Sequence, residues 1–461
     1  MNSEQLSAAL YEKYISPTKK RRAPSIGIEI EMPVVNLNGE AVSEETIIRT
    51  ADAFRAHFGF EPSGTDANGD VNSMTEPETG DNLSFDCSYS NLELSFGKDD
   101  SLHALHQRFV SYYRCLQDLL APHGYTLTGM GINPNYNINH NQPIPNERYR
   151  MLYHYLHSYS EYGAEPGRRF HERPDFGTFT SASQVQLDAE YDTLIDTINV
   201  FGLLEPYKAL LFANSYLPDY PDYLCSRNML WEHSMQGYNP HNIGMFAQPL
   251  RSVDELLEYI KSQSVYCTMR DGKYVNFKPV AVRDYFTRSE ISGEYFDGKT
   301  YRSIRFAPER GDLQYLRTFK FEDLTYRGTI EYRSSCCQPI RDVMTVAAFH
   351  TGLSTQLPAL RELLEHDTVI YGHGYSADEL QHMLSLRELP GFLDRSAVSA
   401  QLCRILDLAA AGLDAQGRHE SEFLAPLYDR ARNLTNPAKD MLQRLESGVP
   451  MKQIIADYAE V

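Results

Sequence analysis

The chain has 461 residues, 42% of them hydrophobic, so it can bury a large core in one domain or in two to three smaller ones. Lys and Arg total 43 against 62 Asp and Glu, and the formal net charge of −19 excludes broad electrostatic attraction to nucleic acid or to an anionic membrane surface. The one basic run, at residues 19–22, is expected to be a solvated approach to the first strand.

No targeting segment is evident in the sequence. The first ten residues lack the charged and then apolar order of a secretion signal, and no stretch approaches the roughly 18 apolar residues that a membrane span needs. The seven cysteines are odd in number and lack metal-type C-x-x-C spacing. We therefore expect a cytoplasmic protein whose cysteines are reduced.

The first predicted elements are a strand and a helix. Residues 25–31 alternate strictly, so their three isoleucines face one way while Glu29 and Glu31 face the other. A helix follows, with Ser43 as its cap, apolar residues at helical spacing, and an end at Gly59.

Three further strands also have one apolar face and one polar face. Residues 91–96 form the first of them, with a helix predicted over residues 101–120 after it; residues 183–188 and 329–333 form the others. Their polar faces carry Glu93, then Gln184 and Gln186, then Glu331 and Arg333, and Asp86 precedes Glu93 by seven residues.

The C-terminal part is predicted to be helical. From about Arg341 onward the pattern is almost wholly helical, with a capping box at Ser376 and Glu379 and an Asn436-Pro437 start before the last helix. Strands followed by a late helical run indicate an α+β fold around a largely antiparallel sheet. We expect residues 1–340 to form a catalytic core and residues 341–461 to pack on it as one compact unit.

Taken together, the polar faces of the four strands favour a reaction assisted by metal ions. A single such face is typical of a strand that meets water, but here three strands contribute carboxylates, one contributes amides, and one Arg is the only cation. In one sheet, five carboxylates would repel one another by several kcal/mol unless cations neutralise them. Mg²⁺ suits oxygen ligands and leaves room for substrate phosphates, so the pattern favours phosphoryl transfer on a nucleotide.

Motifs of several other enzyme classes are missing. The sequence has no G-x-x-x-x-G-K-[ST] loop, no G-x-G-x-x-G, no H-E-x-x-H and no G-x-S-x-G. P-loop, dinucleotide-binding, zinc-protease and serine-hydrolase interpretations therefore have no support.

Seven short segments of the first two thirds resemble the motifs of one family, in order. They are residues 26–31 (IGIEIE), 91–95 (NLELS), 145–149 (PNERY), 184–188 (QVQLD), 211–215 (LFANS), 226–231 (SRNMLW) and 330–333 (IEYR). They are similar to the G-x-E-x-E, ELS, P-x-x-R-Y, QVNLD, LFANS, SR-x-x-x-W and E-x-R motifs of the glutamate-cysteine ligase family. The resemblance is to its plant-like and actinobacterial branch, within the glutamine-synthetase-like carboxylate-amine ligases.

The resemblance implies a fold and a set of site residues. It implies an antiparallel sheet curved into a half-funnel, with ATP and two or three Mg²⁺ between the carboxylate-bearing strands. The implied metal ligands are Glu29, Glu31, Asp86, Glu93, Gln184 and Glu331. Arg227 and Arg333 are implied to contact phosphate or a substrate carboxylate, which a planar guanidinium matches bidentately. Gln186 is a further cofactor contact, at a position where the family has Asn, and Arg148 is a contact to substrate or a packing residue.

The reaction implied is ATP-dependent joining of the γ-carboxyl group of glutamate to an amine through a γ-glutamyl phosphate, with small molecules as the only partners. The sequence departs from the plant-like branch at residues 86–90, which read DCSYS. That branch has an acidic residue followed by a Pro-Gly-Gly-Gln loop, which is one residue shorter. A loop without glycine cannot bring its backbone as close to a bound amino acid, so the acceptor stays open between cysteine and other amines.

Three alternative functions remain, namely a two-metal phosphohydrolase, a ligase for another acid and amine, and a binding module without catalysis.

Overall fold

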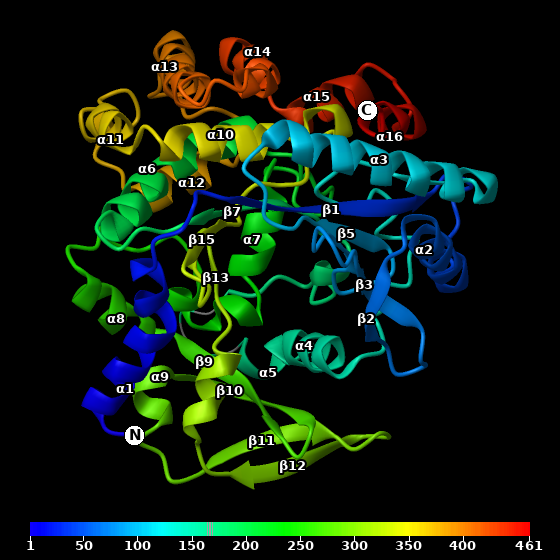
Figure 1. Ribbon diagram of the computed structural model, residues 1–461, viewed down its shortest axis with the longest axis vertical. Helices are drawn as coiled ribbons and strands as arrows, with labels where there is room; N and C mark the ends of the chain where they lie inside the picture. Colours follow the sequence, from blue (N-terminus) through cyan, green and yellow to red (C-terminus); the bar gives the residue numbers. More distant parts are fainter. Residues whose placement is uncertain (164, 166, 168) are drawn as a thin grey trace.

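The computed structural model describes residues 1–461 except 164, 166 and 168, and its strands form three sheets (Figure 1). The largest is nine-stranded and open, in the order β14-β15-β7-β1-β5-β4-β3-β2, with β6 paired to the end of β1. Every pairing in this sheet is antiparallel. Its strands are β1 (Ile26–Asn36), β2 (Glu61–Thr65), β3 (Val71–Thr75), β4 (Asn82–Phe85), β5 (Asn91–Ser95), β6 (Tyr125–Leu127), β7 (Ser183–Asp188), β14 (Glu322–Leu324) and β15 (Thr329–Tyr332).

A second sheet of four antiparallel strands lies below the acidic strands in Figure 1. It consists of β9 (Ser264–Arg270), β10 (Lys273–Ala281), β11 (Ile291–Phe296) and β12 (Tyr301–Phe306). The sequence analysis did not predict this sheet. A short parallel pair, β8 (Ile243–Gly244) and β13 (Phe319–Lys320), lies between the two larger sheets.

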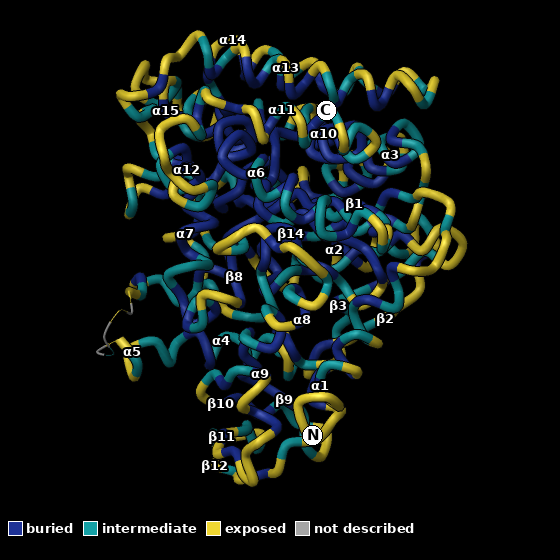
Figure 2. The backbone as a smooth tube through the Cα atoms, turned by 90° about the vertical axis from the view of Figure 1, so that its left-hand side faces the viewer, coloured by how far each residue is buried: buried dark blue, intermediate teal, exposed yellow. Residues whose placement is uncertain are grey.

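The helices form layers on the apolar side of the large sheet. In Figure 1, α3 and α10 run along this side, and α13 and α14 form an outer layer whose outward surface is exposed in Figure 2. The helices up to the end of β15 are α1 (Ser3–Leu10), α2 (Glu44–Phe58), α3 (Leu102–Leu120), α4 (Glu147–His157), α5 (Tyr159–Tyr162), α6 (Leu194–Phe212), α7 (Ser226–Glu232), α8 (Val253–Ser262) and α9 (Val282–Tyr285). Those after it are α10 (Thr345–Ser354), α11 (Leu357–Glu365), α12 (Ala377–Leu384), α13 (Arg395–Asp414), α14 (Ala425–Asn433), α15 (Pro437–Glu446) and α16 (Met451–Tyr458).

The predicted fold class is confirmed as α+β with an open, largely antiparallel sheet and flanking helices. Ser43 accepts a hydrogen bond from the N–H of Thr46 as the cap of α2, and Gly59 ends that helix with a left-handed φ of 75°. The capping box at Ser376 is also present. One boundary was wrong, because Asn436 caps α15 and one more helix, α16, follows it.

The sequence was expected to contain no segment long and apolar enough to span a membrane, but one helix meets this criterion. By length and composition, α13 could span a membrane, and 44% of its most apolar window is buried in this structure. It packs closely on α10, because a Cβ placed on Gly412 would lie 2.1 Å from the carbonyl oxygen of Gly352. Glycine at this crossing lets the two backbones approach each other.

This contact gives a stability prediction. Replacing Gly412 by Ala should lower the free energy of unfolding by about 1–3 kcal/mol, because the added methyl group overlaps Gly352 and outweighs the gain in helix propensity. Urea denaturation measures the change. Gly391→Ala is the control, since a Cβ there meets nothing within 4 Å and its effect should stay within about 0.5 kcal/mol. Equal stabilities of the two variants would contradict the tight crossing.

Candidate active site

The strand register brings the predicted acidic residues into one band on the large sheet. Glu31 of β1 lies opposite Glu93 of β5, and Glu29 lies opposite Gln184 of β7. Alternation explains why they share a face, because Ile28 and Ile30 point into the core and are at most 3% exposed. Asp86 follows β4 directly and accepts a hydrogen bond from the Tyr149 hydroxyl at 3.3 Å.

The band continues toward the edge of the sheet. Glu331 of β15 lies opposite Gln186 of β7 on one side and opposite Asp323 of β14 on the other. Asp323 was not predicted, because its three-residue strand is too short to show alternation. Both of its carboxylate oxygens accept from the Thr318 hydroxyl, at 2.9 and 3.0 Å.

The two glutamine side chains differ in whether their amide oxygen has a hydrogen-bond partner. The Gln184 side-chain amide donates to Glu31 at 2.9 Å, and its buried Oε1 has no hydrogen-bond partner among the described residues. The Gln186 amide donates to Glu29 at 2.8 Å, but its Oε1 accepts from Arg327 at 2.7 Å. Gln184 therefore offers an unused oxygen to a cation, and Gln186 does not.

Burial and mutual repulsion perturb the titration of these acids. Burial, and then Asp86, raises the pKa of Glu31 to about 8, and burial with Asp86 and Glu31 raises that of Glu93 to about 8. Burial, with Glu331 and Glu93, raises the pKa of Glu29 well above its usual range. Without a cation, part of this band holds protons at neutral pH.

The two predicted arginines have different positions. Arg333 pairs with Glu331, with 3.0 Å between Nη1 and Oε2, and both side chains line a cavity of about 1020 Å³. Arg227 is 6% exposed, is not among the residues that line this cavity, and donates from Nη1 to the carbonyl oxygen of Arg333 at 2.9 Å. It holds the backbone that carries Arg333, and it also stabilises the charged form of Glu31.

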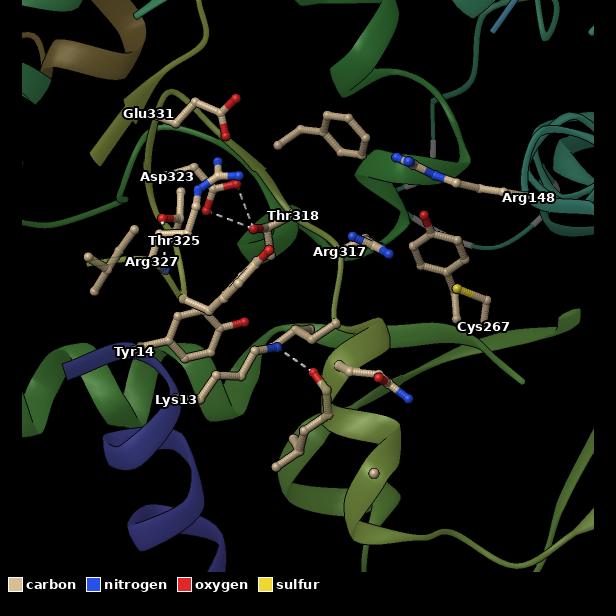
Figure 3. Close-up of a pocket in the computed structure, with 18 of the residues that line it drawn as sticks. Lys13, Tyr14, Arg148, Cys267, Arg317, Thr318, Asp323, Thr325, Arg327 and Glu331 are labelled. Atoms are coloured by element: carbon tan, nitrogen blue, oxygen red, sulfur yellow. Dashed lines mark hydrogen bonds between the residues drawn. The ribbon is translucent and has the colours of Figure 1, made fainter. Parts of the chain in front are cut away.

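The cavity extends from the sheet edge to the second sheet and to the N-terminal segment (Figure 3). Besides Asp323, Glu331 and Arg333, it is lined by several cationic side chains that strand periodicity could not reveal. These are Lys13, Arg148, Arg310, Arg317 and Arg327. Glu331 and Asp323 are the acids of the band that line the cavity, whereas Glu29, Glu31, Asp86 and Glu93 are not among its lining residues. The cavity thus offers both acidic and cationic groups, set among apolar and aromatic side chains, and such groups suit a metal-bound polyphosphate and a carboxylate.

A compact cluster of metal-ligand side chains lies elsewhere. Glu232, Asp378 and His382 place one ligand atom each within 4.8 Å of one another. His382 Nε2 lies 2.7 Å from Glu232 Oε2, so these two side chains already form a direct ion pair. Among the described residues, the carboxylates of the acidic band form no group of three as compact as this one.

The acidic band gives a pH prediction for the metal-free protein. Glu31 and Glu93 have a folded-state pKa of about 8, above the roughly 4.3 of an unfolded Glu, so the folded state binds more protons between these values. Their contribution to stability is full below the unfolded pKa and is lost as the pH rises through about 8. Urea unfolding in chelator should therefore show this loss, and added Mg²⁺ at high pH should reverse it.

Two variants make this measurement specific. Glu93→Gln removes one raised pKa and should flatten the dependence of stability on pH. Glu61→Gln changes an exposed acid on β2 of the same sheet and should behave like the wild type. Identical pH profiles for all three proteins would show that the band is not under electrostatic strain.

Two plant enzymes are similar in sequence to this chain. Chloroplastic glutamate–cysteine ligase of Nicotiana tabacum is 22% identical over 364 residues, covering 76% of this chain and 63% of that protein. The enzyme of the same name from Brassica juncea is 23% identical over 370 residues, covering 76% and 64%. The chain thus spans somewhat less than two thirds of the length of these relatives.

A solved structure and a family model also match. The glutamate–cysteine ligase of Francisella tularensis, crystallised with AMP, has a TM-score of 0.44 and 11% identity, covering 96% of this chain and 88% of that one. The sequence model of glutamate-cysteine ligase family 2 matches residues 25–459. The chain belongs to glutamate-cysteine ligase family 2.

Proposed function

We propose that this protein is an ATP- and magnesium-dependent ligase that joins the γ-carboxyl group of glutamate to an amino group. The observation that carries the proposal is the acidic band, which reaches a cavity of about 1020 Å³ through Glu331 and Asp323, beside Arg333. Membership of the family and the names of the plant relatives support the same reaction class.

The acidic band suits Mg²⁺ on chemical grounds. The donor set is all oxygen, it carries uncompensated negative charge, and it includes the orphaned Oε1 of Gln184. We assign as ligands Glu29, Glu31, Asp86, Glu93, Gln184 and Glu331, and the structure adds Asp323 as a candidate. Bound ions, two or three by analogy with the family, would offset charge on the β- and γ-phosphate oxygens of ATP.

The chain's own residues would then position the reactants. Arg333, fixed by Glu331 and through its backbone by Arg227, is placed to meet the phosphoryl group as it moves to the γ-carboxylate of glutamate. This transfer gives an acyl phosphate and ADP. The amino group attacks the acyl carbon, phosphate leaves, and the amide bond remains. Gln186, which orients Glu29 and Arg327, acts here through its neighbours.

The division of the chain is part of the proposal. Residues 1–340 would carry the catalytic machinery, and the helices of residues 341–461 would support it from the apolar side of the sheet. One hydrophobic cluster includes Ile28 and Ile30 of β1 together with Phe349 of α10 and Leu406 of α13, so the two parts share a core. We also propose that the enzyme is cytoplasmic.

An ADP-release assay tests the ligase reaction. With ATP, Mg²⁺ and glutamate, ADP release should depend on an added amine, and mass spectrometry should detect the γ-glutamyl product. Cysteine belongs in a panel with other amino acids and simple amines. Release that ignores glutamate and every amine would instead favour the two-metal phosphohydrolase.

Site variants test the assigned ligands. Glu29→Gln and Glu331→Gln should each lower kcat by roughly 10²–10³-fold, because each removes a charge that stabilises metal-bound phosphates in the transition state. The matched control is Glu61→Gln, an exposed carboxylate on β2 that should leave kcat unchanged. Wild-type turnover in both site variants would remove these residues from catalysis.

A further inference from the structure

Part of the cavity lining carries three cationic side chains, Lys13, Arg148 and Arg317, and we refer to them as the cationic wall. Arg148 lies near Asp86 and Lys13 lies near Asp323. Among the described residues none of the three forms an ion pair, whereas Arg310 and Arg333 in the same cavity each pair with a glutamate. In Figure 3 the Arg148 and Arg317 side chains lie close to each other, with Lys13 below them.

Lys13 reaches the cavity from the N-terminal segment. It lies in a π-helical turn, Tyr11–Ile15, directly after α1, and such turns are often found at functional sites. Its ammonium donates to the carbonyl oxygen of Leu313, which uses one of its three donors. Burial and then the nearby Arg317 lower the pKa of Lys13 to about 8, while Asp323 opposes this shift, so two cations and one acid share this part of the cavity.

Part of the segment 9–14 lines the cavity although this segment precedes the region that matches the family. The family match begins at residue 25, but Ala9, Glu12, Lys13 and Tyr14 all line the cavity. Figures 1 and 2 both place α1 beside α9 and the second sheet, which contributes Tyr266, Cys267 and Tyr274 to the cavity lining. A part of the substrate cavity is thus built from residues outside the matched family region.

We infer that Lys13 and Arg317 form an oxyanion-binding subsite for a substrate group that is not held by metal, and that residues 9–14 help to set substrate selectivity. The inference rests on the proposed ligase function. A merely structural Lys13 would account for the bond to Leu313, but it would leave Arg317 facing the cavity beside a second cation. A bound oxyanion would neutralise both and accept charge-assisted hydrogen bonds from them.

The chemistry of the acidic band and of the cationic wall indicates which oxyanion binds. Polyphosphate oxygens are drawn to cations held by the acidic band, so the cationic wall remains for a free carboxylate of an amino-acid substrate. The subsite therefore fits a carboxylate better than a neutral amine. A phosphate of the nucleotide is the other possible source of the oxyanion, and the experiment separates the two.

Kinetics of Lys13 variants test the subsite. Lys13→Met should raise the KM of one substrate by about 10–100-fold, the loss expected for a charge-assisted hydrogen bond, and Lys13→Arg should restore most of it. Lys19→Met is the matched control, because Lys19 is in the same N-terminal segment, contacts the Tyr11 and Tyr191 rings, and does not line the cavity. A raised KM for glutamate or the acceptor assigns a carboxylate, and one for ATP assigns a phosphate.

Direct binding measurements test the subsite independently of the proposed reaction. Calorimetric titrations of wild type, Lys13→Met and Lys19→Met with glutamate, Mg-ATP and inorganic phosphate need no turnover, so they remain readable if no amine supports ADP release. Weaker binding of at least one ligand to Lys13→Met alone supports the subsite. Unchanged affinities for all three ligands together with unchanged KM values, with thermal melting showing that the variant is folded, would overturn it. Arg317→Met provides a second variant on a different element.

Discussion

Electrostatic repulsion among carboxylates held at fixed spacing is the constraint on which this structure depends. Antiparallel pairing places Glu31 directly opposite Glu93, and partners in such pairs lie about 5 Å apart. The register cannot slip to relieve them, because a shift by one residue would move the isoleucines of β1 to the polar face and the acids into the core. Hydrophobic burial behind the sheet therefore holds the charges together in front of it, and a cation bound there would relieve the repulsion.

The same constraint explains how the rest of the chain is arranged. Helices α3, α10, α13 and α14 lie on the apolar side of the sheet, and the acidic side faces α4, the second sheet and the N-terminal segment. Arginines then complete the charge balance: Arg333 pairs with Glu331 within the band, while Arg227 stays buried behind and holds the Arg333 backbone. Core packing behind the sheet thus fixes the geometry of the site. The acidic and cationic side chains at the cavity would then determine which substrates and ions can bind there.

Local periodicity predicted the parts of this arrangement that depend on neighbouring residues. The alternation of β1, β5, β7 and β15 and the caps at Ser43 and Ser376 are visible in short windows of sequence. Asp323, Lys13 and Arg317 were missed because their roles arise from contacts between distant segments. Gln184 and Gln186 looked equivalent, and only the Arg327 contact distinguishes their free oxygens.

The loop between β4 and β5 bears on how an acceptor is recognised. Cys87 has a φ of 61°, a conformation that glycine adopts without strain, and side chains hold the loop in place: Ser88 donates to the Thr178 carbonyl at 2.7 Å and Tyr89 to Asp66 at 2.9 Å. The N–H groups of Asp86 and Ser88 are bonded within the loop. These two N–H groups are therefore already bonded and not free to bind a substrate. Of the proposed cationic wall, Lys13 comes from a part of the chain that precedes the matched family region.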